Sequence, residues 1–293
     1  TPLALVLSPL VALRVPIDAT RLPWDPAQWA LLALSEIVLA LPFVAAGLGI
    51  LLALTLAGQK PGRIYASSFV GAGCGAAASL FVMMVMLPER GLAMPALIAV
   101  PGALAAAGTT SARSTARYAG WIAAVLSAVV LAFPAWRLDV SPYKGLPQVE
   151  SYPGARRISE AASPAGWVVE AEAPAFRYAP GLSLAFHGDF PRQRGLFVDG
   201  QLAGAISDAG QEGAVRVLVE HLPTALPYAL GARERVLVIG AGDGVEVANA
   251  RVHGAMEVTA LELHPELARR VRDQISSDPG SRGRPGRTLS GNK

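Results

Sequence analysis

The sequence has few of the residues that usually hold soluble or metal-binding domains together. Of its 293 residues only 16% are charged, and it has one cysteine. A single cysteine excludes an intrachain disulfide and a zinc site built on cysteines. Because Cys74 lies inside an apolar run, we expect it to be a small packing residue, and we expect no metal. The formal charge is only +3, and no basic stripe is interleaved with aromatic residues, so nucleic-acid binding is not expected.

Hydrophobic residues make up 52% of the chain, and they are unevenly distributed. Charges are sparse from Glu36 to Arg137, whereas Arg, Asp and Glu recur every few residues after that point. This asymmetry predicts two domains, a transmembrane helical domain over residues 1–137 and a soluble domain over 166–275. A polar, proline-containing linker is expected at 138–165. The segment 276–293 is rich in Gly, Pro and Arg, which predicts a disordered tail.

The membrane half contains four uncharged intervals of 19 to 25 residues. A helix needs about 20 apolar residues to cross a bilayer core of about 30 Å, so each interval predicts a span and the lipid bilayer is an expected partner. The intervals are residues 37–59, 64–88, 91–112 and 118–136. The apolar run at 1–13 has no basic region before it, which predicts a partial span of a longer protein. Flanking Lys and Arg residues favour a cytoplasmic soluble domain by a small margin.

The soluble half begins with β-forming runs separated by Pro and Gly, including "GWVVEAEA", "LSLAFHG" and "RGLFVDGQLAGAIS". These runs predict a small antiparallel β region over residues 166–207. A helix is expected to follow, through Leu222, and to be bent or ended by Pro223 and Pro227. Strand, helix, strand and helix are then expected between residues 235 and 275, which is the beginning of a parallel, Rossmann-like α/β fold.

The first of these parallel strands ends in the glycine-rich loop Gly240-Ala241-Gly242-Asp243-Gly244. A dinucleotide fingerprint needs Gly or Ala at the sixth position of G-x-G-x-x-G, where this chain has Val245. Glu262 ends the second strand, 22 residues after Gly240, where a carboxylate can accept hydrogen bonds from both ribose hydroxyls. Together they indicate a site for an adenosyl sulfonium. The alternative is an ordinary glycine turn with Glu262 as a surface charge.

The segment "RVLVIGAGDGVEVANARVHGAMEVTALELHPELARRVRD" resembles the spermidine/spermine synthase family of polyamine aminopropyltransferases. Combined with a helical membrane half, it looks like the bacterial membrane-fused branch. The resemblance implies that decarboxylated S-adenosylmethionine is the co-substrate, that an aminopropyl group passes to putrescine or a similar amine, and that the protein lies in the inner membrane, with a homodimer as a further expectation. It also implies roles for five residues: Gly240, Gly242 and Gly244 would line the nucleoside, Asp243 would lie beside the loop, and Glu262 would hold the ribose.

Three further residues match the family loosely: Asp199 in "LFVDG", and Glu220 and His221, which stand where the family has Tyr-His-Glu. His264 replaces an Asp that is common in the family. The family's catalytic Asp lies in a loop after later strands that the sequence does not predict, so the catalytic residues stay unknown. We therefore expect a chain that is incomplete at both ends, and an enzyme that is inactive or incomplete in this form. Two alternatives remain open: an S-adenosylmethionine-dependent methyltransferase, and a non-catalytic membrane protein that senses a nucleoside or holds a partner.

Overall fold

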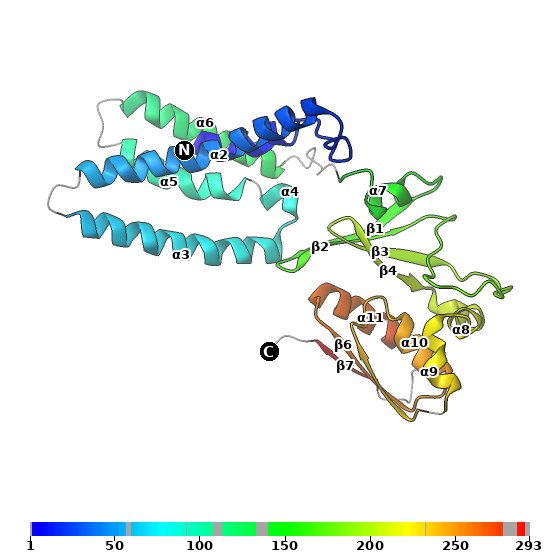
Figure 1. Cartoon of the computed structure of the whole chain (residues 1–293). Helices are drawn as coiled ribbons and strands as arrows, with labels where there is room; N and C mark the ends of the chain where they lie inside the picture. Colours follow the sequence, from blue (N-terminus) through cyan, green and yellow to red (C-terminus); the bar gives the residue numbers. More distant parts are fainter. Residues whose placement is uncertain are drawn as a thin grey trace. The chain divides into compact units, whose positions relative to one another are not determined.

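The computed structural model of the chain is shown in Figure 1. It describes residues 2–56, 60–91, 93–107, 113–132, 140–231, 233–277 and 286–290. The chain divides into two compact units, Thr1–Asp139 and Val140–Lys293. This division falls two residues after the end predicted for the transmembrane domain, and each unit is described below by itself.

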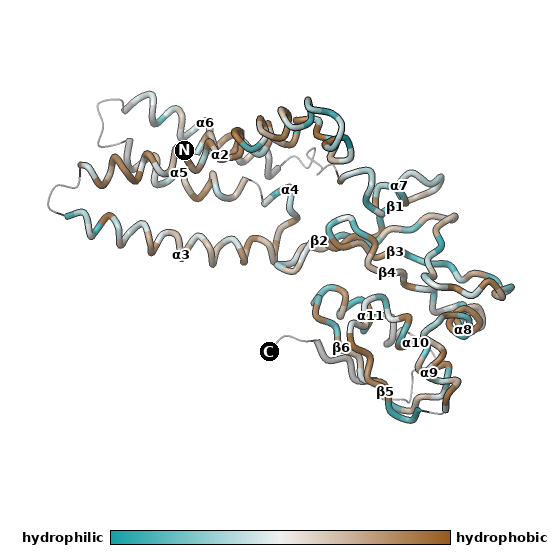
Figure 2. The backbone as a smooth tube through the Cα atoms, in the orientation of Figure 1, coloured by the Kyte–Doolittle hydropathy of each residue, from teal (hydrophilic) through white to brown (hydrophobic). Residues whose placement is uncertain are grey.

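The first unit consists of helices. They are α1 (Pro2–Ala12), α2 (Pro26–Leu56), α3 (Pro61–Val85), α4 (Pro88–Gly91), α5 (Met94–Ala107) and α6 (Arg113–Ala132). Helix α1 packs against α2, α5 and α6, and α5 packs against α6. Two helices, α2 and α3, are long and apolar enough to cross a membrane, with mean hydropathies of 2.7 and 1.8 in their most apolar windows. Figure 2 shows hydrophobic residues along both.

The predicted spans agree with this unit in part. Intervals 37–59 and 64–88 overlap α2 and α3, and the structure describes the first as far as residue 56. Interval 91–112 contains the 14-residue helix α5, which is too short to cross a bilayer, and residues 108–112 lie outside the described residues. Interval 118–136 overlaps α6, in which residues 117–129 form a shorter apolar stretch. The described residues thus show two candidate spans, not four.

The second unit begins with an antiparallel sheet in the order β1-β2-β3-β4. Its strands are β1 (Arg156–Ser163), β2 (Gly166–Glu172), β3 (Gln193–Val198) and β4 (Gln201–Ser207), and helix α7 (Gly145–Glu150) precedes them. An antiparallel region was predicted from residue 166, but the expected linker at 138–165 contains α7 and β1. The "LSLAFHG" run, 182–188, which was expected to form part of the sheet, is a loop, and the strand beside β2 is β1.

A parallel sheet in the order β5-β6-β7 follows. The elements of this part are α8 (Glu212–Glu220), α9 (Leu226–Ala229), β5 (Arg235–Ile239), α10 (Val245–Val252), β6 (Glu257–Glu262), α11 (Pro265–Ser277) and β7 (Gly286–Ser290). The strands and helices between 235 and 275 lie where the sequence predicts them. Strand β7 lies in the segment 276–293 that was expected to be disordered. It pairs with β6 through main-chain groups, which polar residues carry as well as apolar ones.

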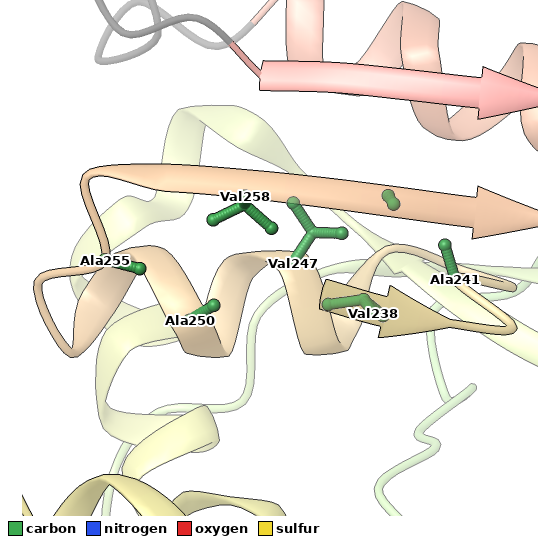
Figure 3. Close-up of a cluster of buried hydrophobic side chains, with 7 residues drawn as sticks. Val238, Ala241, Val247, Ala250, Ala255 and Val258 are labelled. Carbon is green, nitrogen blue, oxygen red and sulfur yellow. The ribbon is translucent and has the colours of Figure 1, made fainter. Parts of the chain in front are cut away.

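Helix α10 packs against the parallel sheet, and helix α11 packs against the antiparallel sheet. Val238 of β5 and Val258 of β6 pack against Val247 and Ala250 of α10 in a buried cluster (Figure 3). Leu267 of α11 packs with three buried residues of the antiparallel sheet, Val168, Leu196 and Ile206. On β5 the two neighbours of Val238 point to the opposite face of the sheet and are exposed: Leu237 is 57% exposed and Ile239 is 76% exposed.

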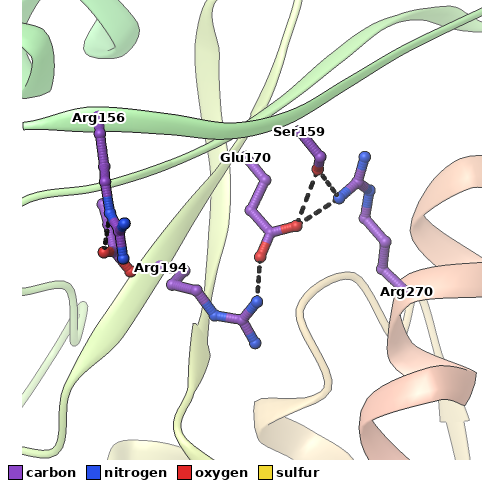
Figure 4. Close-up of polar contacts among 6 residues, drawn as sticks. Arg156, Ser159, Glu170, Arg194 and Arg270 are labelled. Carbon is purple, nitrogen blue, oxygen red and sulfur yellow. Dashed lines mark hydrogen bonds and ion pairs between the residues drawn. The ribbon is translucent and has the colours of Figure 1, made fainter.

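A polar cluster also joins α11 to the antiparallel sheet (Figure 4). The Glu170 side chain of β2 is only 7% exposed, and it forms ion pairs with Arg270 of α11 and Arg194 of β3. Arg270 Nη1 also donates to Ser159 Oγ of β1 over 2.6 Å. A buried charge is tolerated when it is paired and hydrogen-bonded, as Glu170 is here. The cluster therefore fixes α11, and with it the end of β6, against the antiparallel sheet.

Candidate functional site

The glycine-rich loop lies between β5 and α10, and its backbone requires glycine. The φ angles of Gly240, Gly242 and Gly244 are 74°, 49° and 83°. These values are in the left-handed region, which residues with a Cβ adopt only at a cost. The amides of Gly240 and Ala241 both donate to the carbonyl of Leu261, over 2.9 and 3.0 Å. The loop therefore turns directly beside the end of β6.

Glu262 is joined to this loop by a hydrogen bond. Its Oε2 accepts from the amide of Gly242 and its Oε1 accepts from the amide of His264, each over 2.8 Å. Glu262 is 8% exposed, so the alternative that it is a surface charge is wrong. Each carboxylate oxygen has two lone-pair sites, so each can accept one more hydrogen bond, from a ribose hydroxyl for example.

Asp243 attaches the loop to the antiparallel sheet. Its Oδ2 accepts from the amide of Ala205 in β4 over 2.8 Å, and its Oδ1 accepts from the amide of Val245 over 3.1 Å. Burial raises the pKa of the Asp243 carboxyl, and the two amides oppose that rise. The approach is close, because a Cβ on Gly204 would lie 2.5 Å from Asp243 Oδ2. Asp243 is therefore engaged in positioning the loop.

The other side of the loop is open. Among the described residues, a Cβ at Gly240 would meet nothing within 4 Å, and one at Gly242 would meet only the carbonyl oxygen of Gly240, at 3.7 Å. Backbone that has no Cβ and faces open space can be approached closely by a ligand. The loop and Glu262 also lie at the carboxyl ends of two adjacent parallel strands, which is where open α/β sheets bind their ligands. The residues present therefore fit a nucleoside.

The three loosely matched residues make contacts elsewhere. Asp199 has a φ of 49° in the turn between β3 and β4, and its Oδ1 accepts from the amide of Trp167 over 2.9 Å. The His221 ring lies at the end of α8, with Nδ1 2.7 Å from the carbonyl oxygen of Val217. Glu220 is an exposed residue of the same helix. No contact found among the described residues joins these three to the glycine-rich loop.

Two features of the site were not found by sequence reasoning. One is the contact of Gly204 and Ala205 with Asp243, for which an isolated glycine inside a strand was the available signal. The other is the burial of the His264 ring. The sequence analysis named this residue only as a departure from the family, whereas its two ring nitrogens are buried and have no hydrogen-bond partner in the described part of the chain. A search of the described residues found no group of His, Cys, Asp and Glu that could hold a metal ion.

Comparison with known proteins adds no assignment. No protein-family model matches the chain, and no curated protein matches it.

Proposed function

We propose that the chain is a membrane-anchored protein with a Rossmann-like domain that binds decarboxylated S-adenosylmethionine for aminopropyl transfer to putrescine or a similar amine. The main support is the position of Glu262, a buried carboxylate at the carboxyl end of β6 that is hydrogen-bonded to the glycine-rich loop at the end of β5. An acidic residue at this place can accept hydrogen bonds from the ribose hydroxyls of a nucleoside. The open side of Gly240 leaves room for such a ligand.

The proposed reaction is a displacement at carbon. A neutral amine of the acceptor attacks the methylene carbon that is bonded to the sulfonium. The C–N bond forms while the C–S bond breaks, and sulfur leaves as a thioether with the electron pair. The new ammonium group then gives its proton to a base. Among the described residues we assign the binding of the nucleoside to Gly240, Gly242, Gly244 and Glu262 and the positioning of the loop to Asp243, and we assign no base.

The membrane part of the proposal is an anchor that crosses a bacterial inner membrane at α2 and α3, with the α/β domain in the cytoplasm, where the co-substrate would be made. It is supported by the length and hydropathy of α2 and α3 and by their exposure. Only 6% of the most apolar window of α2 is buried, and none of that of α3. A helix with an apolar surface exposed on most sides is suited to lipid.

Isothermal titration calorimetry of the full chain in detergent micelles tests the nucleoside site. Decarboxylated S-adenosylmethionine is expected to bind more tightly than S-adenosylmethionine. The reverse order would favour a methyltransferase, and no binding of either would favour a non-catalytic role. Glu262→Gln is expected to weaken binding about 10- to 100-fold, because a hydrogen bond to a charged group contributes about 1.5–3 kcal/mol. Glu257→Gln, at the exposed amino end of the same strand, is the matched control and should bind normally. Equal affinities of the two variants would contradict the site.

A further inference from the structure

The loop at residues 13–25, between α1 and α2, is folded by its own hydrogen bonds. Gln28 in the first turn of α2 is 7% exposed, and its Oε1 accepts from the amide of Asp18 over 2.8 Å. The indole nitrogen of Trp29 donates to the carbonyl of Leu22, also over 2.8 Å. The Asp18 carboxylate accepts from the amide and the hydroxyl of Thr20. These bonds fix the loop to the beginning of α2.

Two large aromatic rings are exposed on this fixed loop and the turn that follows it. Trp24 is 78% exposed and Trp29 is 59% exposed. Charged groups accompany them, including Asp18 and Arg21, which form an ion pair at 3.2 Å. Trp has an apolar ring and a polar N–H group, and it concentrates at membrane–water interfaces, where both are accommodated. A polar turn that displays two Trp rings has the composition of a surface that contacts the headgroup region.

The length of α2 places these rings at a suitable depth. At a rise of 1.5 Å per residue, its 31 residues extend about 46 Å. A bilayer has a hydrocarbon core of about 30 Å and a total thickness of about 40–45 Å with its polar regions. With the uncharged interval 37–59 in the hydrocarbon core, the first part of α2, which contains Trp29 and Glu36, extends beyond the core into the polar region.

We propose that the 13–25 loop and Trp29 form an interfacial platform that binds the phospholipid headgroup layer, with the Trp24 and Trp29 rings inserted among the headgroups. The inference rests on the membrane part of the proposed function. The platform sets the depth of α2 in the bilayer, because its hydrogen bonds hold both rings in a constant position relative to the helix. Its partner is the bilayer surface, and the charged side chains of the loop stay hydrated among the headgroups.

Fluorescence quenching in reconstituted vesicles tests the platform. The full chain is reconstituted in phosphatidylcholine and phosphatidylglycerol with Trp24 or Trp29 as the one remaining tryptophan and the others replaced by Phe. Phospholipids brominated at shallow or deep acyl positions, and aqueous iodide, are the quenchers. Both residues are expected to lose more fluorescence with shallow bromines than with deep ones. Two more single-tryptophan variants are the controls. A Phe43→Trp reporter near the middle of α2 should lose more fluorescence with deep bromines, and a variant that keeps only Trp167, which is 5% exposed in β2, should respond to neither brominated lipid.

The outcomes separate the platform from the anchor. If the Phe43→Trp reporter is quenched deeply while Trp24 and Trp29 respond to iodide alone, the platform is wrong and the anchor stands. If the reporter is not quenched by brominated lipids, α2 does not cross the bilayer, and both ideas fail. Should the single-tryptophan variants not fold, Trp24→Cys in a Cys74→Ala background, labelled with a small fluorophore, gives the same depth measurement.

Discussion

Glu170 is expected to contribute more to stability than any exposed carboxylate of the antiparallel sheet. Glu170→Ala removes the one carboxylate that pairs with both Arg194 and Arg270. The Arg270 side chain is 10% exposed, and its Nε already has no hydrogen-bond partner in the described part of the chain, so the substitution leaves it with Ser159 as its polar contact. Breaking a buried ion pair from one side costs about 3–5 kcal/mol. Arg194 is 41% exposed and can turn to water, so we expect a loss of about 3 kcal/mol.

The matched control lies two positions along the same strand. Glu172 pairs with Arg156 at 2.6 Å, but the two side chains are 30% and 71% exposed. An exposed ion pair contributes about 0–1 kcal/mol, so Glu172→Ala should lower the free energy of unfolding by no more than that. The two substitutions remove the same group from the same strand and differ mainly in burial.

Urea unfolding of the full chain in detergent gives both values. Trp167 is buried in the same strand, three residues before Glu170, so its fluorescence reports the sheet when the other tryptophans are replaced by Phe. A double-mutant cycle of Glu170→Ala with Arg270→Ala should show a coupling free energy above about 1 kcal/mol, because the residues are in direct contact. Equal losses for Glu170→Ala and Glu172→Ala, or no coupling to Arg270, would refute the role of the buried cluster.

Two further predictions concern the attachment of the glycine-rich loop. Gly204→Ala places a Cβ 2.5 Å from Asp243 Oδ2 and should lower the free energy of unfolding in urea by about 1–3 kcal/mol. Gly213→Ala in α8, where a Cβ meets none of the described residues within 4 Å, should be neutral or stabilising. Because the folded-state pKa of Asp243 is raised, its contribution to stability is full below the unfolded pKa of about 3.9 and is lost as the pH rises through the folded value. The free energy of unfolding should therefore decrease less with rising pH above about pH 4 in Asp243→Asn than in the unchanged chain. Equal pH profiles of the two proteins would contradict the raised pKa of Asp243.

The sequence predicts the elements that carry both a hydrophobic period and a boundary residue. Strands β5 and β6 are short apolar runs, α10 ends before Gly254, whose φ is 88°, and α11 begins at Pro265, so all four were found. Strands β1 and β7 were missed for a common reason. Their sequences, "RRISEAAS" and "GRTLS", are largely polar, and main-chain pairing with β2 and β6 places them in the sheets. Such pairing depends on tertiary context that a local window does not contain.

The candidate site shows the same division between local and tertiary information. The loop glycines and Glu262 could be found because their spacing along the chain reflects the two adjacent strand ends. The hydrogen bond between Glu262 and Gly242 could not be found in that way, nor could the contact of Asp243 with Ala205, which joins residues 38 positions apart. Both contacts support the loop from the protein side and leave the outer face of Gly240 open. A loop held in this manner is positioned before a ligand arrives, and less conformational freedom is then lost on binding. Gly204→Ala should therefore weaken the proposed binding of the nucleoside in the calorimetric titration, although residue 204 lies on the protein side of the loop.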